Sequence, residues 1–456
     1  MGAELSCLLS RRGWLRLGGV SLAELALSQH VHGERAGPAP ATRSCVLFVL
    51  QGGPSQLDIW DLKPSAPAEV RGPFRPASTS VAGLQLVEYL PRLARVAHLF
   101  TIVRSMTHKT VFHHAAGYYA LSGQPPLRDG TVLSAGETDH PHPGAILAVK
   151  QPAAPGLPTA VSLPNLIEEG FHPIPAQGAG FLGARYAPFA VNGDPNEPTF
   201  AVEGLKGDHL RKDIGERRRL LQSVNRARDW LEAEPNVRHM GAVQQRALDL
   251  LSSGAAHQAF DLGSEPARLR DRYGRHKAGQ SLLLARRLVE AGVRMVTVYW
   301  GGRLNKPLPY WDTHEALAGR LKDELLPPFD QCFSAFLEDL DARGLLKTTL
   351  VVCLGEFGRT PKMEQFTGNG ADPTGRDHWP HCYSLVLAGG PAGGGRVIGR
   401  SDHRGAYPAD DPIAPEDVMA TLLSGLGVNP RDPVRDSFGR SVPLCAGRVM
   451  PSLFGT

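Results

Sequence analysis

A continuous run of apolar and β-branched residues at positions 348–354 stops at the pair Gly355-Glu356. Runs of this kind form strands that are buried on both faces of a parallel sheet. Ligands of open α/β sheets bind outside the carboxyl ends of the strands, so Glu356 lies where a site is expected. This one segment therefore predicts both a fold class and the edge of the sheet at which function is to be sought.

Similar apolar runs alternate with helical patterns along the rest of the chain. Alternation of this kind is typical of α/β proteins, so we predict a mostly parallel central sheet with flanking helices. Between about residues 204 and 291, charged residues and leucines alternate at helical spacing, which predicts a helical insertion that covers the sheet or forms a cap. Further strands are predicted at residues 44–51, 100–103, 159–162, 294–300 and 384–388, and helices at 86–99, 315–340 and 415–426.

The first 41 residues have the features of an export signal. Arg11-Arg12 precede a short apolar run, and Ala39-Pro40-Ala41 fits a cleavage site made of small residues. The apolar run is too short to cross a bilayer, so no stable membrane span is expected. We predict a twin-arginine signal at residues 1–41, a domain at residues 42–456, and a periplasmic or extracellular location. The alternative is a surface helix with two arginines placed by chance.

Charge and cysteine content exclude several classes of protein. The net charge is +4 over 456 residues and no long Lys/Arg stripe is present, so no nucleic-acid partner is expected. Six cysteines are present, of which one lies in the predicted signal, and none shows C-x-x-C spacing. This pattern predicts neither a disulfide framework nor a zinc site made of cysteines.

Asp312 and His314 follow another predicted strand. They are two residues apart, and in extended backbone such side chains point to the same side. A carboxylate together with an imidazole suits zinc, manganese or iron, with calcium as an alternative. Asp312 could instead cap the helix that is predicted to begin near residue 315.

Glu356 and His378 are candidates for the same site. Glu356 lies between two glycines, and we predict that it is a metal ligand or a general base, with an ion pair to Arg359 as the alternative. Asp377 and His378 are adjacent in a loop bounded by Gly and Pro. We predict His378 as the ligand and Asp377 as a group that orients a neighbouring imidazole. A polar surface loop without a site is the alternative.

A third cluster of candidates follows the strand predicted before residue 107. His113 and His114 are predicted metal ligands, and Thr107 and Thr110 are predicted nucleophiles that a metal ion would activate. Packing of these imidazoles in the core is the alternative. Asp58, shortly after the first strand, is a further candidate ligand, although turn formation explains its position as well.

Six motifs together resemble one known family. They are L-F-V-L-Q-G-G-P-S-Q-L-D-I-W-D, V-R-S-M-T-H, D-R-Y-G-R-H, W-D-T-H, G-E-F-G-R-T-P and G-R-D-H-W-P, and they are spread over nearly all of the chain after the signal. In these motifs the chain resembles the bacterial family called domain of unknown function 1501, which is grouped with the alkaline phosphatase and sulfatase superfamily. The resemblance implies an alkaline phosphatase-like α/β domain.

The resemblance also implies a type of site. The superfamily holds two metal ions above a parallel sheet and attacks phosphate or sulfate esters with Thr, Ser or a modified Cys. By position, one metal site maps onto Asp312, His314 and His378. The second site maps poorly, because the superfamily's usual D-H-G reads Glu356-Phe357-Gly358 here and Phe cannot coordinate a metal. One divalent ion is therefore expected rather than two, and the lack of a C-x-P-x-R motif argues against a formylglycine sulfatase.

These observations predict an exported, metal-dependent, hydrolase-like protein that acts on a phosphate, sulfate or related ester. Its substrate would be a small anionic ester or a polysaccharide, and Arg359 or Arg376 would stabilise the anionic group. The alternative is a non-catalytic protein that binds an anionic polysaccharide or a protein partner on a degenerate hydrolase scaffold. A scaffold with a structural ion is a third interpretation. The sequence leaves the oligomeric state open.

Overall fold

The computed structural model describes residues 42–130, 135–170, 172–202, 219, 244, 247–301, 310–368, 370, 372–436 and 438–454. The predicted signal at residues 1–41 lies outside the described residues, as does most of the first half of the predicted helical insertion. All statements below concern the described part of the chain.

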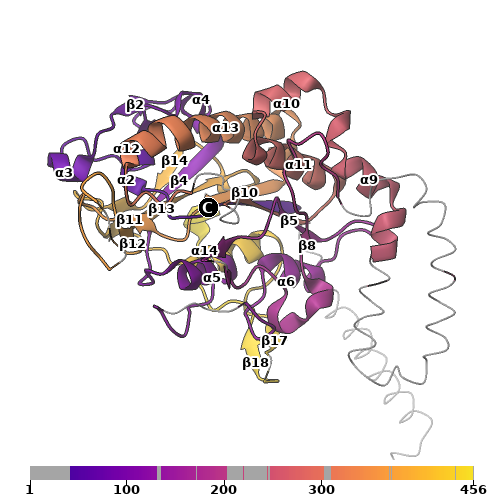
Figure 1. The fold of residues 1–456 in the computed structure, drawn as a ribbon. Coiled ribbons are helices and arrows are strands. Elements are labelled where there is room, and N and C mark those ends of the chain that lie inside the picture. The colour runs from indigo at the N-terminus through magenta and orange to yellow at the C-terminus, as the bar shows by residue number, and fades with distance from the viewer. Residues whose placement is uncertain are drawn as a thin grey trace, which may run out of the picture. The chain divides into compact units, whose positions relative to one another are not determined.

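An eight-stranded sheet forms the centre of the domain (Figure 1). In spatial order its strands are β14 (Arg396–Ile398), β4 (Phe100–Met106), β13 (Tyr383–Ala388), β10 (Thr349–Leu354), β1 (Ser44–Leu50), β9 (Met295–Trp300), β5 (Ala160–Leu163) and β8 (Phe189–Ala190). Neighbouring strands are parallel except where β13 pairs with β4 and with β10. The predicted α/β class with a mostly parallel central sheet is confirmed.

Helices cover both faces of this sheet. Alternate residues of β1 point to opposite faces, so Val46 and Phe48 pack in one hydrophobic core while Cys45 and Leu47 pack in the other. One core is closed by α4 (Pro91–Arg95), α9 (Gly254–Phe260), α10 (Ala267–Tyr273), α11 (Lys277–Ala291) and α13 (Leu326–Ala342), and the other by α5 (His113–Ser122), α6 (Pro143–Lys150) and α14 (Pro415–Gly425) (Figure 1). Within the region predicted as an insertion, α11 therefore belongs to the layer that covers the sheet.

Short ribbons and helical turns surround these layers. Three further helices are α2 (Gln56–Ile59), α3 (Ala68–Arg71) and α12 (Leu317–Gly319). The two-stranded ribbons pair β2 (Pro76–Ser78) with β3 (Gln85–Val87), β6 (Glu168–Glu169) with β7 (His172–Pro173), β11 (Gly358–Arg359) with β12 (His378–Trp379), β15 (Arg400–Ser401) with β16 (Pro408–Asp410), and β17 (Pro433–Arg435) with β18 (Ser441–Pro443).

The helix predicted over residues 86–99 is wrong. The first residues of that segment form β3 and pair with β2, and α4 begins only at Pro91. Proline favours the first position of a helix, because its missing N–H has no partner there and its φ angle is already suitable. The proline therefore separates two short elements within one amphipathic pattern.

Two further observations concern membrane spans and the cysteines. Within the described residues, no helix combines the length and the apolar character needed to cross a bilayer. The cysteines of the domain are free thiols with buried side chains, at Cys45, Cys332, Cys353, Cys382 and Cys445.

Candidate metal centre

The candidate site lies at the carboxyl edge of the sheet. Strands β4, β10, β1 and β9 run in the same direction, so their carboxyl ends share one edge. The segments that follow these strands carry, in the same order, His113, Glu356, Gly52 and Asp312. Strand β13 runs the opposite way and begins at that edge, and His378, a few residues before it, reaches the same place.

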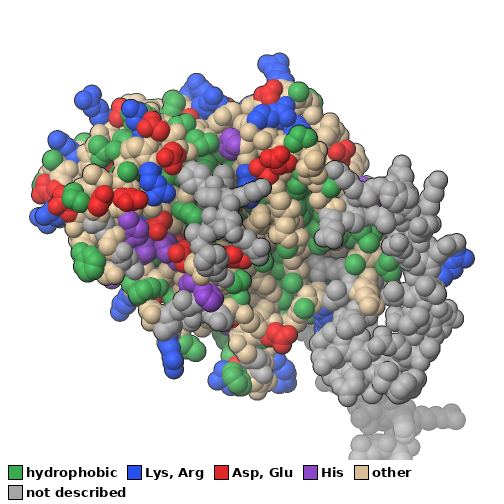
Figure 2. Space-filling model, in the orientation of Figure 1, with side chains coloured by type: hydrophobic (Ala, Val, Ile, Leu, Met, Phe, Trp, Pro, Cys, Tyr) green, Lys and Arg blue, Asp and Glu red, His purple; other side chains and the backbone are tan. Residues whose placement is uncertain are grey.

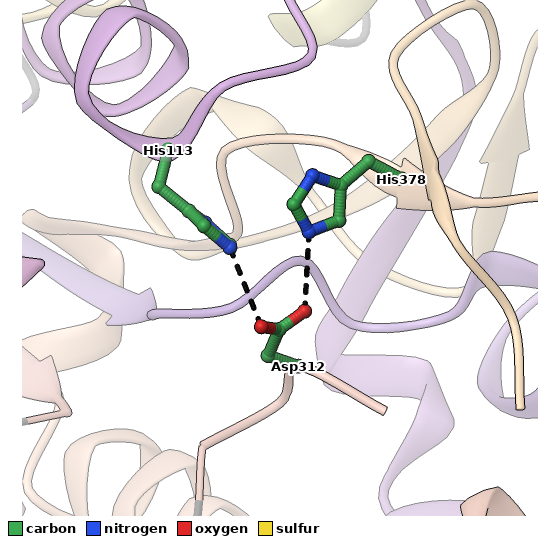
Figure 3. A group of neighbouring side chains, drawn as sticks. All are labelled: His113, Asp312 and His378. Carbon is green, nitrogen blue, oxygen red and sulfur yellow. Dashed lines mark hydrogen bonds and ion pairs between the residues drawn. The ribbon is translucent and has the colours of Figure 1, made fainter. Parts of the chain in front are cut away.

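Three imidazoles converge on the carboxylate of Asp312. Its Oδ1 atom lies 2.9 Å from Nε2 of His314 and 3.2 Å from Nε2 of His378, and these two nitrogens are 3.0 Å apart. Its Oδ2 atom lies 3.5 Å from Nε2 of His113. Figure 3 shows the rings of His113, at the start of α5, and of His378, in β12, directed at the two oxygens of Asp312.

The remaining nitrogen of each ring faces an oxygen on the side away from Asp312. Nδ1 of His378 lies 2.7 Å from the carbonyl oxygen of Val111, and Nδ1 of His113 lies 2.6 Å from Oε1 of Glu356. Nδ1 of His314 lies 3.5 Å from a carboxylate oxygen of Asp377. The oxygens of Val111 and Glu356 hold the ring protons of His378 and His113 on Nδ1, which leaves Nε2 free to bind an ion. Nδ1 of His314 makes no hydrogen bond to the described residues.

Separations between these atoms fit a metal ion. Ligand atoms around a tetrahedral ion with bonds of about 2.0–2.1 Å lie about 3.3 Å from one another. The distances among Asp312 and its three imidazoles run from 2.9 to 3.5 Å. His378 belongs to both groups of possible ligands, one with His113 and Asp312 and one with His314 and Asp377. The first group fits better, because Asp377 lies on the Nδ1 side of His314.

Charges around the centre favour an ionised carboxylate. Burial acts against the charge of Asp312, but Arg359 and the surrounding imidazoles outweigh it and hold the pKa of this carboxyl well below its usual range. Burial lowers the pKa of His378 to about 4, so this ring is neutral, as a metal ligand must be. Burial opposes a charge on His113 as well, yet hydrogen bonds to Asp312 and Glu356 raise its pKa to about 10, so an ion that binds its Nε2 must displace a proton.

Glu356 lies behind His113 rather than beside the other ligand atoms. Its Oε1 atom accepts hydrogen bonds from His113 and, at 2.8 Å, from the backbone N–H of Gly52. Gly52 has a φ of +113°, and a Cβ atom there would lie 2.5 Å from the backbone nitrogen of Asp312. The glycine after β1 therefore allows its N–H to reach Glu356 while the chain of Asp312 passes close by.

Phe357 forms one wall of the centre. Its ring centroid lies 4.4 Å from that of His378 and 5.0 Å from that of His113. The phenyl ring fixes the orientation of both imidazoles and keeps water from that side. The opposite side is open, since the side chains of Asp312 and His314 are 29% and 23% exposed. Figure 2 shows histidine side chains gathered beside acidic ones on this face of the molecule.

The two arginines that were predicted to bind an anionic group are fully buried. All three side-chain nitrogens of Arg359 donate within the protein, to the carbonyl oxygens of Gly52, Gly53 and Arg376 and to Asp312. Arg359 thereby holds Asp312 in place and has no exposed face. The geometry assigns it the ion pair with the ligand carboxylate instead of a contact with substrate.

Arg376 and Asp58 form a separate buried pair. Nε of Arg376 lies 2.8 Å from Oδ2 of Asp58, and both side chains are inaccessible to solvent. The other nitrogens of Arg376 donate to the carbonyl oxygens of Val70, Thr360 and Pro361. Asp58, a candidate ligand in the sequence, is therefore placed away from the centre, where it helps to anchor the loop before His378.

The remaining candidates lie around the centre without joining it. His114 turns toward His172, with ring centroids 6.2 Å apart. The backbone N–H groups of Thr107 and Thr110 donate to Ile413 and to the His108 ring, and their hydroxyls are not among the groups that surround Asp312. His108 supports the backbone of the site, because its Nε2 lies 2.7 Å from the carbonyl oxygen of Glu356.

Several contributors gave no signal in the sequence. Val111 acts through its backbone carbonyl and Gly52 through its N–H, groups that nearly every residue possesses. Glu169 lies in β6, a short strand without a recognisable sequence motif, and its electrostatic partners include His113, Asp312 and His314.

Fold and site together define an α/β protein with a histidine-rich candidate metal centre at the carboxyl edge of a mostly parallel sheet. The chain belongs to the family described as protein of unknown function, DUF1501, whose model matches residues 42–454. No curated protein matches the sequence.

Similar solved structures include members of the predicted superfamily. One is Ps i-CgsB in complex with k-i-k-neocarrahexaose, which is 10% identical with a TM-score of 0.40 over 85% of this chain and 72% of that chain. Another is the lipoteichoic acid synthase LtaP from Listeria monocytogenes, 11% identical with a TM-score of 0.39 over 92% of this chain and 78% of that chain. A protein in the alkaline phosphatase superfamily from Vibrio parahaemolyticus is 12% identical, with a TM-score of 0.37 over 85% and 67%. These likenesses concern the fold alone.

Proposed function

We propose that the protein is an exported hydrolase that holds one divalent ion and cleaves a phosphate, sulfate or related ester. One observation supports this proposal most strongly: the Nε2 atoms of three histidines surround Asp312, while each Nδ1 atom faces an oxygen. Imidazoles that merely pack in a core have no reason to share this orientation. The arrangement suits zinc, manganese or iron.

The residues of the centre have separate tasks in this proposal. A bound ion would polarise the ester oxygen and lower the pKa of a coordinated water or hydroxyl. Asp312 and the three imidazoles would hold the ion, and Glu356 and the carbonyl of Val111 keep two of the rings in the binding tautomer. The open side beside His314 admits the ester. Water is the favoured attacking group, with the hydroxyls of Thr107 and Thr110 as alternatives.

Metal analysis tests the proposal directly. Protein purified without a polyhistidine tag is expected to contain about one zinc, manganese or iron ion per chain, because the two groups of possible ligands share His378. Removal of the ion by a chelator is expected to lower the Tm and to abolish turnover of aryl phosphate or aryl sulfate esters, and added metal restores both. The readouts are elemental analysis, thermal unfolding and release of the phenol.

The outcomes of that experiment separate the alternatives. A chain that binds no divalent ion contradicts the proposal. Bound metal without ester turnover, together with retention of an anionic polysaccharide after chelation, favours the non-catalytic binder. Loss of thermal stability as the sole effect of chelation favours a scaffold with a structural ion.

Export by the twin-arginine route is part of the proposal and is supported by the residues of the N-terminus. Replacement of Arg11 and Arg12 by Lys is expected to retain the protein in the cytoplasm, because the transport machinery reads the arginine pair. Cell fractionation followed by immunoblotting measures this. Unchanged location of the double variant would remove the export proposal and leave the hydrolase proposal intact.

A further inference from the structure

Glu169 lies within electrostatic range of the candidate metal centre, in a segment that the sequence did not single out. The ribbon of β6 and β7 follows β5, and β5 runs parallel to β9 in the central sheet. The carboxyl end of β5 therefore lies at the same edge as the carboxyl ends of β1, β9 and β10. The fold brings Glu169 to the edge that carries Asp312 and Glu356.

Two contacts hold this ribbon against neighbours of the site residues. Nε2 of Gln51, the residue before Gly52, donates to the carbonyl oxygen of Glu168 at 2.8 Å. On the other strand, the ring of His172 contacts that of His114, which is next to His113. His172 is also the ladder partner of Glu169. Glu169 thus lies between two contacts that hold the ribbon. One is made by the neighbour of Gly52 and the other by the neighbour of His113.

The carboxylate of Glu169 is available for chemistry. The side chain is half-buried, and within the described residues it makes no hydrogen bond or ion pair. Burial raises its pKa, the charges of Asp312 and Glu356 add to this effect, and those of His113 and His314 oppose it. A carboxyl group that keeps its proton to higher pH than usual, at the rim of a site, has the property that a general acid needs.

We propose that Glu169 is the catalytic acid of this site, which gives a proton to the leaving oxygen of the ester. This inference rests on the proposed hydrolase function. The bond from phosphorus or sulfur to the leaving oxygen breaks, and that oxygen takes the Glu169 proton and departs as an alcohol. The oxygen of water bonds to phosphorus or sulfur, and one proton of this water returns to the Glu169 carboxylate.

A leaving-group series tests this role with Glu169→Gln. General acids matter most for poor leaving groups, which need a proton, and least for good ones. With metal-loaded full-length protein, we expect turnover of a phenyl ester to fall by about 100-fold or more, and that of the matching 4-nitrophenyl ester by less than about 5-fold. Metal content is expected to be unchanged. Glu168→Gln, in the same ribbon and with its backbone carbonyl intact, serves as the matched control.

Each outcome decides between the two levels of inference. An equal loss for both esters, an unchanged phenyl ester rate or a loss of bound metal would overturn the role of Glu169 while the hydrolase proposal stands. A wild-type protein that turns over neither ester overturns the hydrolase proposal, and the role of Glu169 falls with it. Glu169→Asp, which retains a carboxyl group, should recover part of the phenyl ester rate if proton donation is the function lost.

Discussion

Replacement of His378 by Ala is expected to leave the purified protein without its ion and to lower ester turnover by about 10³-fold or more. His378 belongs to both groups of possible ligands, and its Nε2 atom lies within 3.2 Å of Asp312 and 3.0 Å of His314. Loss of this nitrogen opens one ligand position and leaves Asp312 and His314 without their shared neighbour. Elemental analysis and the rate of phenol release measure the two effects.

His381→Ala provides the control for this experiment. His381 is three residues further on, and its ring packs against Trp379 and Tyr407 instead of the centre. Its replacement is expected to preserve metal content and turnover. If His378→Ala retained a full complement of ion, the centre would not be where the convergence of the three imidazoles places it.

Replacement of Arg376 by Met is expected to lower the free energy of unfolding by about 3–5 kcal/mol. Arg376 and Asp58 are both inaccessible to solvent, and the guanidinium also donates to three backbone carbonyls. Methionine fills part of the space but leaves the Asp58 carboxylate buried without its counter-charge. The cost arises from that unpaired charge and from the orphaned carbonyl oxygens. Urea-induced unfolding measures the change.

Two further variants show whether burial is the cause. Arg400→Met removes the partner of Asp410 on the surface, where water replaces the lost contact, and is expected to leave stability unchanged. Asp58→Leu combined with Arg376→Met removes both charges and is expected to be more stable than Arg376→Met alone. A stable Arg376→Met protein would mean that the pair is not essential to the loop before His378.

The strands of the sheet were predictable from sequence because they are buried on both faces. The run at residues 348–354 consists of apolar and β-branched residues, and residues 349–354 form β10 with every residue buried. Every residue of β1 and of β9 is buried as well. A strand of this kind needs no alternation of polar and apolar residues, so its ends are marked by the first glycine or charge.

The prediction of one helix over residues 86–99 was wrong for a related reason. Its spacing of apolar residues fits a helix, but those residues serve two elements that face the same core, β3 and α4. Periodicity records which residues are buried and not the backbone that buries them. Pro91 was the available signal for the boundary, because a helix begins readily at proline and rarely continues through one.

Of the candidate site, the residues that act through ionisable side chains could be proposed, with the exception of Glu169, and those that act through backbone could not. The structure places Asp312, His314 and His378 together, as the W-D-T-H and G-R-D-H motifs suggested. The buried role of Arg376 could not be foreseen, since a guanidinium near a loop of histidines reads equally as an anion-binding group. Burial is a property of the whole fold and is absent from a local motif.

The reversed strand β13 has a consequence for how this scaffold can change. Because β13 begins where β10 ends, the chain between them leaves the sheet at Glu356 and comes back to the same rim. The two ends of this segment are held by the strands of the sheet, whereas Phe366 between them is 73% exposed. A change in the length or sequence of the segment around Phe366 would alter what approaches His314. It would leave the pairing of the strands in the central sheet intact. Relatives with different substrate specificities should therefore differ most in this segment. Libraries randomised there are a practical route to new specificity.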